Sequence, residues 1–336
     1  MDNNRKMDRI PCVTLPTISI VIPTYNRSRC LRKALDSFVR QMYLSEIILV
    51  DDGSTDDTPH VFECFSRENS SYGLTFKYIR NEKKKGPSAA RNIGVDAASS
   101  PYIVFGEDDV IFAPDYCQVL LESMIQNPCG AVAGRFVYLK EGETPDQAFN
   151  RIEAEFPDRD KPHGRDLFTK VEYGLPIDEE IVVPILPAFI LVRRDLVRQI
   201  RFDENTYIRG RGMREENDFQ IRLQMAGYNL RLVPQTYLCH LPRPTHDPGG
   251  QWSGGLIGAA FWEIVNTGIF WKRYHSFLKE HFDIEPNWPL MLARQSLLRI
   301  RRLLSEILAL YTPNLHRLVK RLTDLYESLQ TRNRSH

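Results

Sequence analysis

The chain has 336 residues, 42% of them hydrophobic, and a formal net charge of only +1. A chain of this size can bury a full core, so we expect one composite α/β domain with an appendage. The sequence argues against a zinc module, a signal peptide and a transmembrane helix, because its six cysteines lack paired spacing, Met1–Arg9 is charged, and no run of about 18 apolar residues occurs.

The first third of the chain alternates strand-like and helix-like segments. Apolar runs rich in β-branched residues predict four strands, at 18–23, 46–50, 74–79 and 102–105. Helical periodicity after the first strand places Leu31 and Leu35 on one face, with Ser28 as the expected cap. A second helix is expected near 61–67, and a helix of small residues opens behind Gly86. This alternation predicts a parallel sheet flanked by helices.

Polar clusters follow three of these strands directly, at 24–27, 51–57 and 107–109. Ligands of such sheets bind at the carboxyl ends of the strands. We therefore expect the three clusters to share one crevice.

The third cluster consists of the carboxylates Glu107, Asp108 and Asp109. Like charges this close raise one another's pKa, and a divalent cation would remove that penalty. Carboxylates at the end of a buried strand can hold Mg²⁺ or Mn²⁺ and leave positions open for substrate phosphates. The alternative is a solvated acidic turn.

The pattern changes after Gly130. Residues 131–137 predict another strand, and 139–180 is polar and irregular, which is typical of a functional loop or lid. Residues 182–192 are apolar again.

An acidic run at 215–218 opens a helix that Gly227 ends, and its expected apolar face consists of Phe219, Leu223 and Ala226. Acidic residues in a first turn also favour the helix dipole, so helix capping is an alternative role for this run. A further strand covers 227–234, and the Pro/Gly-rich segment 241–255, which contains His246, is suited to closing over a ligand.

Four motifs together resemble the ordered signature of family 2 glycosyltransferases. They are Val-Ile-Pro-Thr-Tyr-Asn at 21–26, Val-Asp-Asp-Gly-Ser-Thr-Asp at 50–56, Ala-Ala-Arg-Asn-Ile-Gly at 89–94 and Glu-Asp-Asp at 107–109. Each motif alone is weak, but four in this order are highly specific, and a looser resemblance continues to about residue 240. The resemblance implies the GT-A fold, a Rossmann-like and mostly parallel sheet flanked by helices.

The implied organisation has three parts. They are an N-terminal extension at 1–17, a GT-A domain at 18–245 with a nucleotide-sugar half at 18–110 and an acceptor half at 130–245, and a C-terminal helical, amphipathic region at 246–336. The implied activity is inverting sugar transfer that uses a nucleotide-diphosphate sugar, with a UDP-sugar favoured, and Mn²⁺ or Mg²⁺. The acceptor would be a glycan or a lipid-linked molecule in the synthesis of cell-surface glycans.

The resemblance assigns donor binding to Pro23, Thr24, Tyr25, Arg27, Asp52, Arg91 and Asp108. Thr24, Tyr25 and Asp52 would hold the nucleobase, whereas Asp51 suits a turn ahead of Gly53. Arg91 can pair with a phosphate or an active-site carboxylate. Its alternative role is a structural salt bridge to Asp52 or Asp108.

Metal binding is implied for Asp109, with Asp108 touching the ribose or the metal. The family has Asp at the first place of this motif, so Glu107 has an open role. His240 matches a third metal ligand or a diphosphate contact, although a lone His is also a common structural residue.

The catalytic base of the family lies in a Glu-Asp-x-Asp cluster, which Glu215, Glu216 and Asp218 match here. Glu216 is then the base, with Glu in place of Asp, and Glu215 is a competing candidate. Two other functions stay open, a nucleotidyltransferase of the same fold and a non-catalytic sugar-nucleotide-binding scaffold. The sequence lacks the first one's Gly-rich phosphate loop, and the acidic clusters argue against the second.

The C-terminal tail is basic and helical in period. Residues 288–336 carry nine Lys/Arg and three Asp/Glu, a net charge of +6, so the first 287 carry −5. One apolar stripe consists of Ala293, Leu297, Ile300, Leu304, Leu308 and Tyr311, and a second one of Leu315, Leu318, Leu322, Leu325 and Leu329. Basic amphipathic helices suit an anionic membrane surface, here at 290–330.

The alternative for this tail is a helical hairpin packed on the domain or on a second subunit, as in a homo-oligomer. Its leucine content argues against nucleic-acid binding. We expect a cytoplasmic protein, because its cysteines suit reduced, buried thiols. Through the basic tail, it would associate peripherally with the inner face of the membrane.

Overall fold

The computed structural model describes residues 16–155, 174, 176–207, 213–242, 256–282 and 287–311. The predicted alternation in the first third is confirmed. Its elements are β1 (Ile18–Thr24), α1 (Ser28–Phe38), β2 (Leu44–Asp51), α2 (Thr58–Glu68), the short 3₁₀ helix η1 (Ser70–Tyr72), β3 (Thr75–Arg80), α3 (Pro87–Ala97) and β4 (Tyr102–Phe105). Strands β3, β2, β1 and β4 pair in that order, and their parallel pairing was predicted.

Helices cover both faces of this parallel part because its strands are apolar on both sides. Leu31 and Leu35 of α1 pack in one fully buried cluster, and Val95 of α3 packs in another on the opposite face. The approach of α3 to β1 requires glycine at position 94, since a Cβ atom there would lie 2.3 Å from Cγ1 of Val21.

The prediction that Ser28 caps α1 is wrong. Ser28 is the first residue of the helix, and no side chain at the capping position, Arg27, bonds to the helix end. The Oδ2 atom of Asp56 instead accepts a hydrogen bond from the backbone N–H of Ser28 at 3.0 Å. An acid from the loop after β2 therefore satisfies this helix end.

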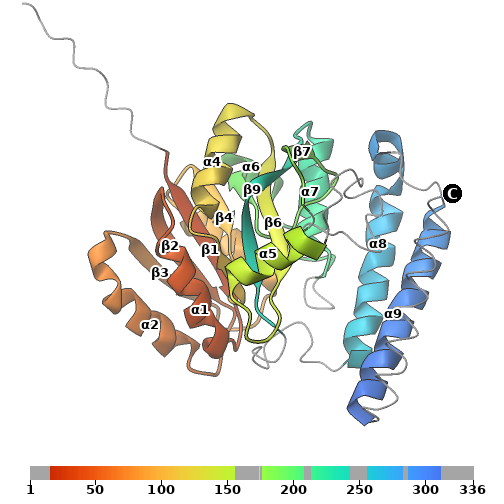
Figure 1. Cartoon of the computed structure of the whole chain (residues 1–336), viewed down its shortest axis with the longest axis horizontal. Helices are drawn as coiled ribbons and strands as arrows, with labels where there is room; N and C mark the ends of the chain where they lie inside the picture. The colour runs from red at the N-terminus through yellow and green to blue at the C-terminus, as the bar shows by residue number, and fades with distance from the viewer. Residues whose placement is uncertain are drawn as a thin grey trace, which may run out of the picture.

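The second part of the sheet is mixed. Its elements are β5 (Val110–Phe112), α4 (Tyr116–Gln126), β6 (Ala131–Tyr138), α5 (Pro145–Glu155), β7 (Ile181–Val182), β8 (Leu191–Arg193), α6 (Arg194–Ile200), α7 (Glu215–Met225) and β9 (Leu230–His240). Strands β6 and β9 are parallel, whereas β8 is antiparallel to both β4 and β6. Among the described residues, one sheet runs in the order β3-β2-β1-β4-β8-β6-β9-β5, and β7 pairs with β9 (Figure 1).

Two expectations for this part need correction. The segment 139–180 is not wholly irregular, because it contains α5, although most of its remainder lies outside the described residues. The apolar run 182–192 overlaps the two short strands β7 and β8. Gly227 does end α7 with a φ of 90°, but Ala226 is exposed and does not belong to the buried face.

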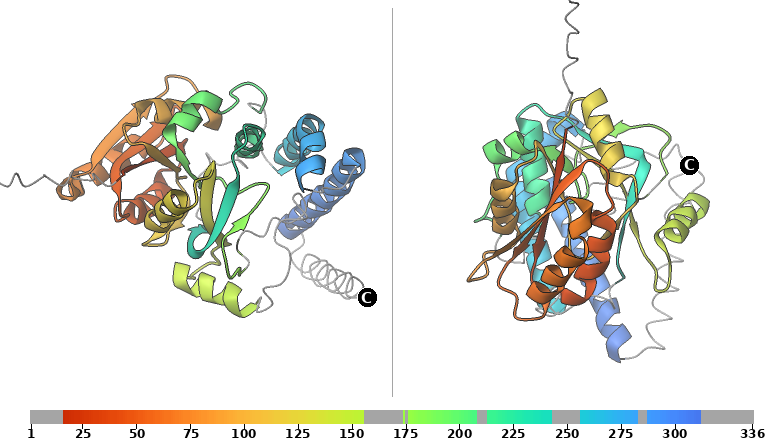
Figure 2. Two further views of the ribbon diagram at one scale, coloured as in Figure 1. Left: turned by 90° about the horizontal axis from the view of Figure 1, so that it is seen from above. Right: turned by 90° about the vertical axis from the view of Figure 1, so that its left-hand side faces the viewer.

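The C-terminal appendage is a pair of packed helices, α8 (Leu256–Phe282) and α9 (Trp288–Tyr311). They lie beside α7, at the end of the molecule opposite β3 (Figures 1 and 2). Phe270, Trp271 and Tyr274 of α8 form a buried cluster with Ile185 and Ile221 of the domain. No helix in the described ranges is long and apolar enough to cross a membrane.

The predicted apolar stripe of α9 points to solvent. Leu297, Ile300 and Leu304 are 68%, 45% and 55% exposed, while Arg299 on another face of the helix is only 5% exposed. The helix α9 thus packs on α8, but not through the predicted stripe. The second stripe and His246 lie outside the described residues.

Candidate active site

The turns after β1 and β2 are joined by side-chain hydrogen bonds. Asn26 has a positive φ of 53°, a conformation that Asn tolerates well. Its backbone N–H donates to Oγ of Ser54 at 2.8 Å, and its Oδ1 accepts from the backbone N–H of Thr55 at 2.7 Å. The polar clusters 24–27 and 51–57 are therefore one surface.

The turn after β1 also contacts the acidic residues that follow β4. Thr24 Oγ1 donates to Oδ2 of Asp108 at 2.7 Å, and Arg27 Nε donates to its Oδ1 at 3.1 Å. A second nitrogen of Arg27 pairs with Asp109. All four side chains are buried. The expectation that the three clusters share one crevice is confirmed.

Asp51 and Asp52 have different surroundings. Asp51 is fully buried and accepts hydrogen bonds from the Ser54 backbone at 2.7 Å and from Arg80 at 3.1 Å, which agrees with a turn role. Asp52 accepts hydrogen bonds from Asn81 and from the backbone N–H groups of Lys85 and Gly86, at 2.8–2.9 Å. Asp52 thus holds the loop that leads into α3.

Tyr25 forms another contact between this loop and the turn after β1. The Nζ atom of Lys84 lies 3.6 Å from the centre of the Tyr25 ring, in cation–π geometry. The loop 81–86 therefore borders the region in which the resemblance locates the nucleobase, a contribution that the motifs alone did not reveal.

Burial and mutual repulsion perturb two of the acids. Burial, with the neighbouring charge of Asp109, raises the pKa of Glu107 to about 8. Burial also raises the pKa of Asp108 to about 7, although the cation of Arg27 works in the opposite direction. These acids are costly to keep ionised without further positive charge.

His240 lies against the same acids, because β9 pairs with β5 and brings His240 opposite Val110. Its Nε2 atom is 3.5 Å from Oδ2 of Asp109, and its Nδ1 is 2.7 Å from the carbonyl oxygen of Leu241. With Nδ1 next to a backbone carbonyl, Nε2 is directed at the acid. Histidines that ligate a metal through one ring nitrogen are commonly hydrogen-bonded through the other in this way.

The donor set of Asp108, Asp109 and His240 fits Mn²⁺ or Mg²⁺ chemically, because it offers carboxylate oxygens and an imidazole nitrogen. Within the described ranges, no three His, Cys, Asp or Glu side chains are already gathered in a metal-binding arrangement. Arg27 contacts both acids and supplies the positive charge there. A metal would take over that role.

Arg91 joins the two halves of the site. It is 2% exposed, and its guanidinium contacts Glu215 at 2.6 Å and both Glu107 and Glu216 at 3.0 Å. Its partners are thus three carboxylates of the candidate site, and the structure shows no ion pair of Arg91 with Asp52 or Asp108 among the described residues. One buried cation holds an acid from the donor half next to two acids from the acceptor half.

Glu215 and Glu216 differ in accessibility. The side chain of Glu215 is 1% exposed, whereas that of Glu216 is 17% exposed. Burial and the charge of Glu216 raise the pKa of Glu215 well above its usual value. Glu216 is thus the more accessible member of the pair.

Asp218 belongs to a separate network. It is fully buried and accepts hydrogen bonds from Arg222 at 2.8 Å, from Arg273 at 2.8 Å and from Tyr274 at 2.5 Å. Arg273 and Tyr274 come from α8, so Asp218 ties the catalytic segment to the appendage. Sequence reasoning missed both α8 residues, and no motif marks them.

Comparisons with known proteins agree with this geometry. The family model described as "Glycosyl transferase family 2" matches residues 19–201. Validoxylamine A glucosyltransferase of Streptomyces hygroscopicus subsp. limoneus is 30% identical over 300 residues, which cover 80% of this chain and 64% of that protein. A Campylobacter jejuni protein named GalNAc(5)-diNAcBac-PP-undecaprenol beta-1,3-glucosyltransferase is 36% identical over 97 residues, covering 28% of this chain and 30% of that one.

The chain matches only part of other curated relatives, namely 18%, 49% and 41% of the length of three of them. Among solved structures, GalNAc-T7 with UDP, GalNAc and Mn²⁺ aligns with a TM-score of 0.50 and 16% identity, over 74% of this chain and 48% of that one, a likeness of fold. The family model covers more than half of the chain, and the protein therefore belongs to glycosyl transferase family 2, with a GT-A fold.

Proposed function

We propose that the protein transfers a sugar from a nucleotide-diphosphate donor, a UDP-sugar in the first instance, to a hydroxyl group of a glycan or lipid-linked acceptor, with inversion at the anomeric carbon. The observation that carries this proposal is the Arg91 cluster. Arg91 contacts both Glu107, which directly precedes Asp108 and Asp109, and Glu216 at the start of α7. A donor group and a base group adjoin one another as direct displacement requires.

The donor would lie along the carboxyl ends of β1, β2 and β4. Pro23, Thr24, Tyr25 and Asp52 are proposed to form the nucleobase pocket, which Lys84 above the Tyr25 ring supports. Because Asp52 already accepts three hydrogen bonds from the 81–86 loop, it would orient that loop as well as the base.

Asp109, Asp108 and His240 would hold Mn²⁺ or Mg²⁺. When bound, the metal would stabilise negative charge on the leaving diphosphate. Arg27, which pairs with both acids, is the side chain best placed to turn toward that diphosphate once the acids have another cation.

Glu216 is proposed as the general base. Its carboxylate is partly exposed and can accept the proton of an acceptor hydroxyl as the new glycosidic bond forms. Glu215 would serve to orient Arg91, and the buried contacts of Asp218 favour a structural role over the catalytic one proposed from its motif.

A panel of UDP-, GDP- and TDP-sugars tests the proposal. We expect one class to raise the melting temperature in the presence of Mn²⁺ or Mg²⁺ and to lose its sugar to an added acceptor. Release of a sugar 1-phosphate instead of a nucleoside diphosphate, when pyrophosphate is added to take up the nucleotidyl group, would indicate a nucleotidyltransferase. Binding without turnover of any sugar across acceptor panels would indicate a scaffold.

We also propose a cytoplasmic protein that associates with the inner face of a membrane in the synthesis of surface glycans. The exposed stripe of α9 supports this, because Leu297, Ile300 and Leu304 lie beside the exposed Arg301. The name of the Campylobacter jejuni relative indicates a lipid-linked acceptor for that protein, which is compatible with such a location.

A further inference from the structure

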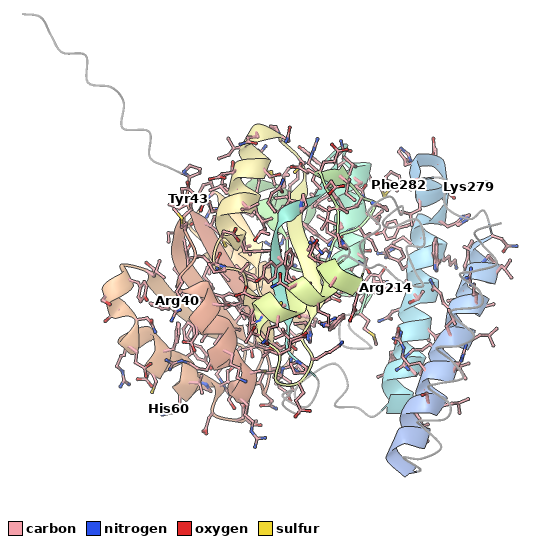
Figure 3. All side chains as sticks on the ribbon, viewed as in Figure 1. Arg40, Tyr43, His60, Arg214, Lys279 and Phe282 are labelled. Carbon is pink, nitrogen blue, oxygen red and sulfur yellow. The ribbon has the colours of Figure 1, made fainter. Side chains whose placement is uncertain are left out.

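A cavity of about 90 Å³ lies where the start of α7 meets α8 and α9, and Arg214 reaches into this region from the side of the domain that faces α8 (Figure 3). Its polar lining comes from the N-cap of α7 and from α8 and α9: Arg214, Glu263, Thr267, Gln295, Ser296, Arg299 and Arg302. None of the residues of the candidate active site described above lines it.

The lining has an excess of positive charge, with three guanidinium groups and one carboxylate. The carboxylate of Glu263 is already paired, since its Oε2 lies 2.6 Å from Nε of the buried Arg299. Arg214 is held in place by Thr267, whose Oγ1 accepts from its Nε at 3.2 Å. Arg302 is exposed at the rim of the cavity.

The side chain of Gln295 independently indicates that the cavity is suited to a polar ligand. Both its amide nitrogen and its amide oxygen are buried, and neither has a hydrogen-bond partner in the structure. A buried amide without partners is unfavourable, so native proteins rarely retain one without a reason. The cavity that it lines is large enough for a small polar ligand rather than a single water molecule.

We propose that this cavity binds a phosphate group, either of a phospholipid or lipid-linked headgroup or of a soluble phosphate ester. Guanidinium groups pair with phosphate oxygens in planar, two-point geometry, and the Gln295 amide and Thr267 hydroxyl supply further donors. The site is distinct from the donor-diphosphate region and does not rest on the proposed sugar transfer. Because Arg214 directly precedes Glu215, a bound phosphate would also steady the start of α7.

The first experiment titrates the full chain with inorganic pyrophosphate by calorimetry. Arg302→Ala should weaken one binding component about tenfold, as the loss of one charge-assisted contact predicts. Lys279→Ala is the control, because Lys279 is an exposed cation on α8 that does not line the cavity, and it should stay within about twofold of the wild type. Equal losses in both variants, or no component that depends on Arg302, overturn the proposal.

Vesicles distinguish the two sources of the phosphate. The same two variants are mixed with phosphatidylcholine vesicles with and without phosphatidic acid. A selective loss of phosphatidic acid binding in Arg302→Ala assigns the cavity to a lipid headgroup. If Arg302→Ala weakens the binding of pyrophosphate but not of phosphatidic acid vesicles, the cavity is assigned to a soluble phosphate ester.

A second variant keeps the test independent of Arg302. Gln295→Leu preserves the shape of the side chain and removes both amide groups. Without anion, its melting temperature should rise by a few degrees because the unsatisfied amide is gone, while pyrophosphate binding weakens. A lower melting temperature with unchanged binding contradicts the proposal. Nucleotide binding, measured in parallel, should be unaffected in all these variants, so failure here is separable from failure of the proposed transfer.

Discussion

At the scale of single residues, the site depends on how carboxylates share cations. Arg27 pairs with Asp108 and Asp109, and Arg91 pairs with Glu107, Glu215 and Glu216. Buried carboxylates are tolerated only when positive charge or hydrogen bonds compensate them. The two arginines therefore assemble the acids, with Arg27 holding one pair and Arg91 bringing Glu107 to the two glutamates of α7.

The base assignment is tested by Glu216→Gln, which keeps the size of the side chain but removes its basicity. The transfer rate should fall about 10²–10⁴-fold, the usual range for general base catalysis, while donor affinity changes little. Steady-state kinetics and nucleotide calorimetry measure the two effects. Near-normal turnover in Glu216→Gln together with loss in Glu215→Gln would move the base to Glu215.

The metal assignment is tested by Asp109→Ala. Turnover should be abolished with the fold intact, and the stabilisation that Mn²⁺ adds to nucleotide binding should disappear. Circular dichroism and a thermal-shift titration with and without metal check both points. Asp36→Ala, an exposed acid on α1, is the control. Full activity of Asp109→Ala, or of the wild type in excess EDTA, contradicts the assignment.

At the scale of elements, buried polar side chains connect strands and helices through hydrogen bonds, in addition to the contacts of the apolar core. Glu46 in β2 is 1% exposed and accepts hydrogen bonds from Lys77 of β3 at 2.6 Å and from the backbone of Ser99 at 2.6 Å. It also pairs with Ser19 of β1. Asp218 performs the corresponding function between α7 and α8.

Glu46 gives a prediction about pH. Burial by itself raises the pKa of Glu46, but hydrogen bonds from Lys77, Ser19 and Ser99 outweigh it and lower the pKa to about 2. A carboxyl group whose pKa is lower in the folded than in the unfolded state stabilises the fold at pH values above its unfolded pKa of 4.5. This contribution is lost as the pH falls toward 2. Glu46→Gln should therefore cost roughly 1–3 kcal/mol at pH 7 and progressively less below pH 4.5. Urea unfolding at several pH values measures this, and a cost that does not change with pH contradicts it.

The tie between α7 and α8 is tested by Tyr274→Phe, which removes one hydrogen bond to Asp218. We expect a loss of about 1–3 kcal/mol in unfolding free energy, because a buried carboxylate loses a donor. Turnover should fall modestly with donor affinity unchanged. Tyr72→Phe is the control, since Tyr72 is 53% exposed. An unchanged stability would show that Arg222 and Arg273 alone suffice.

At the scale of the whole molecule, the appendage presents an apolar stripe that the domain does not cover. Leu297 and Leu304 of α9, the outer of the two appendage helices in Figure 1, are 68% and 55% exposed. An exposed apolar face flanked by arginines is typical of helices that lie in a membrane interface. A second copy of the chain is the competing occupant.

The double variant Leu297→Gln, Leu304→Gln should release the protein from anionic liposomes without altering its melting temperature or nucleotide affinity. Ile125→Gln is the control, because Ile125 is also 52% exposed but lies on α4. Sedimentation of liposomes and of the free protein measures both possibilities. If the variant instead converts a dimer to a monomer and binds liposomes unchanged, the stripe is a subunit interface.

The sequence by itself determined the parallel half of the fold and most of the candidate site. Continuous β-branched runs followed by polar turns define buried strands, and the carboxyl ends of parallel strands lie at one edge, so the turns at 24–27, 51–57 and 107–109 had to meet. The motifs identified the family correctly, as the match over residues 19–201 confirms.

Only the tertiary structure decided which acid each cation holds and which face of each late helix is covered. Arg91 and Glu215 are 124 positions apart, and Asp218 and Tyr274 are 56 apart. Local periodicity has no information about such pairs, so the sequence did not separate Glu216 from Glu215 or reveal the α8 partners of Asp218. The stripe of α9 was readable, but its exposure depends on the packing of Arg299 and its neighbours against α8, because burial is a property of the assembled molecule.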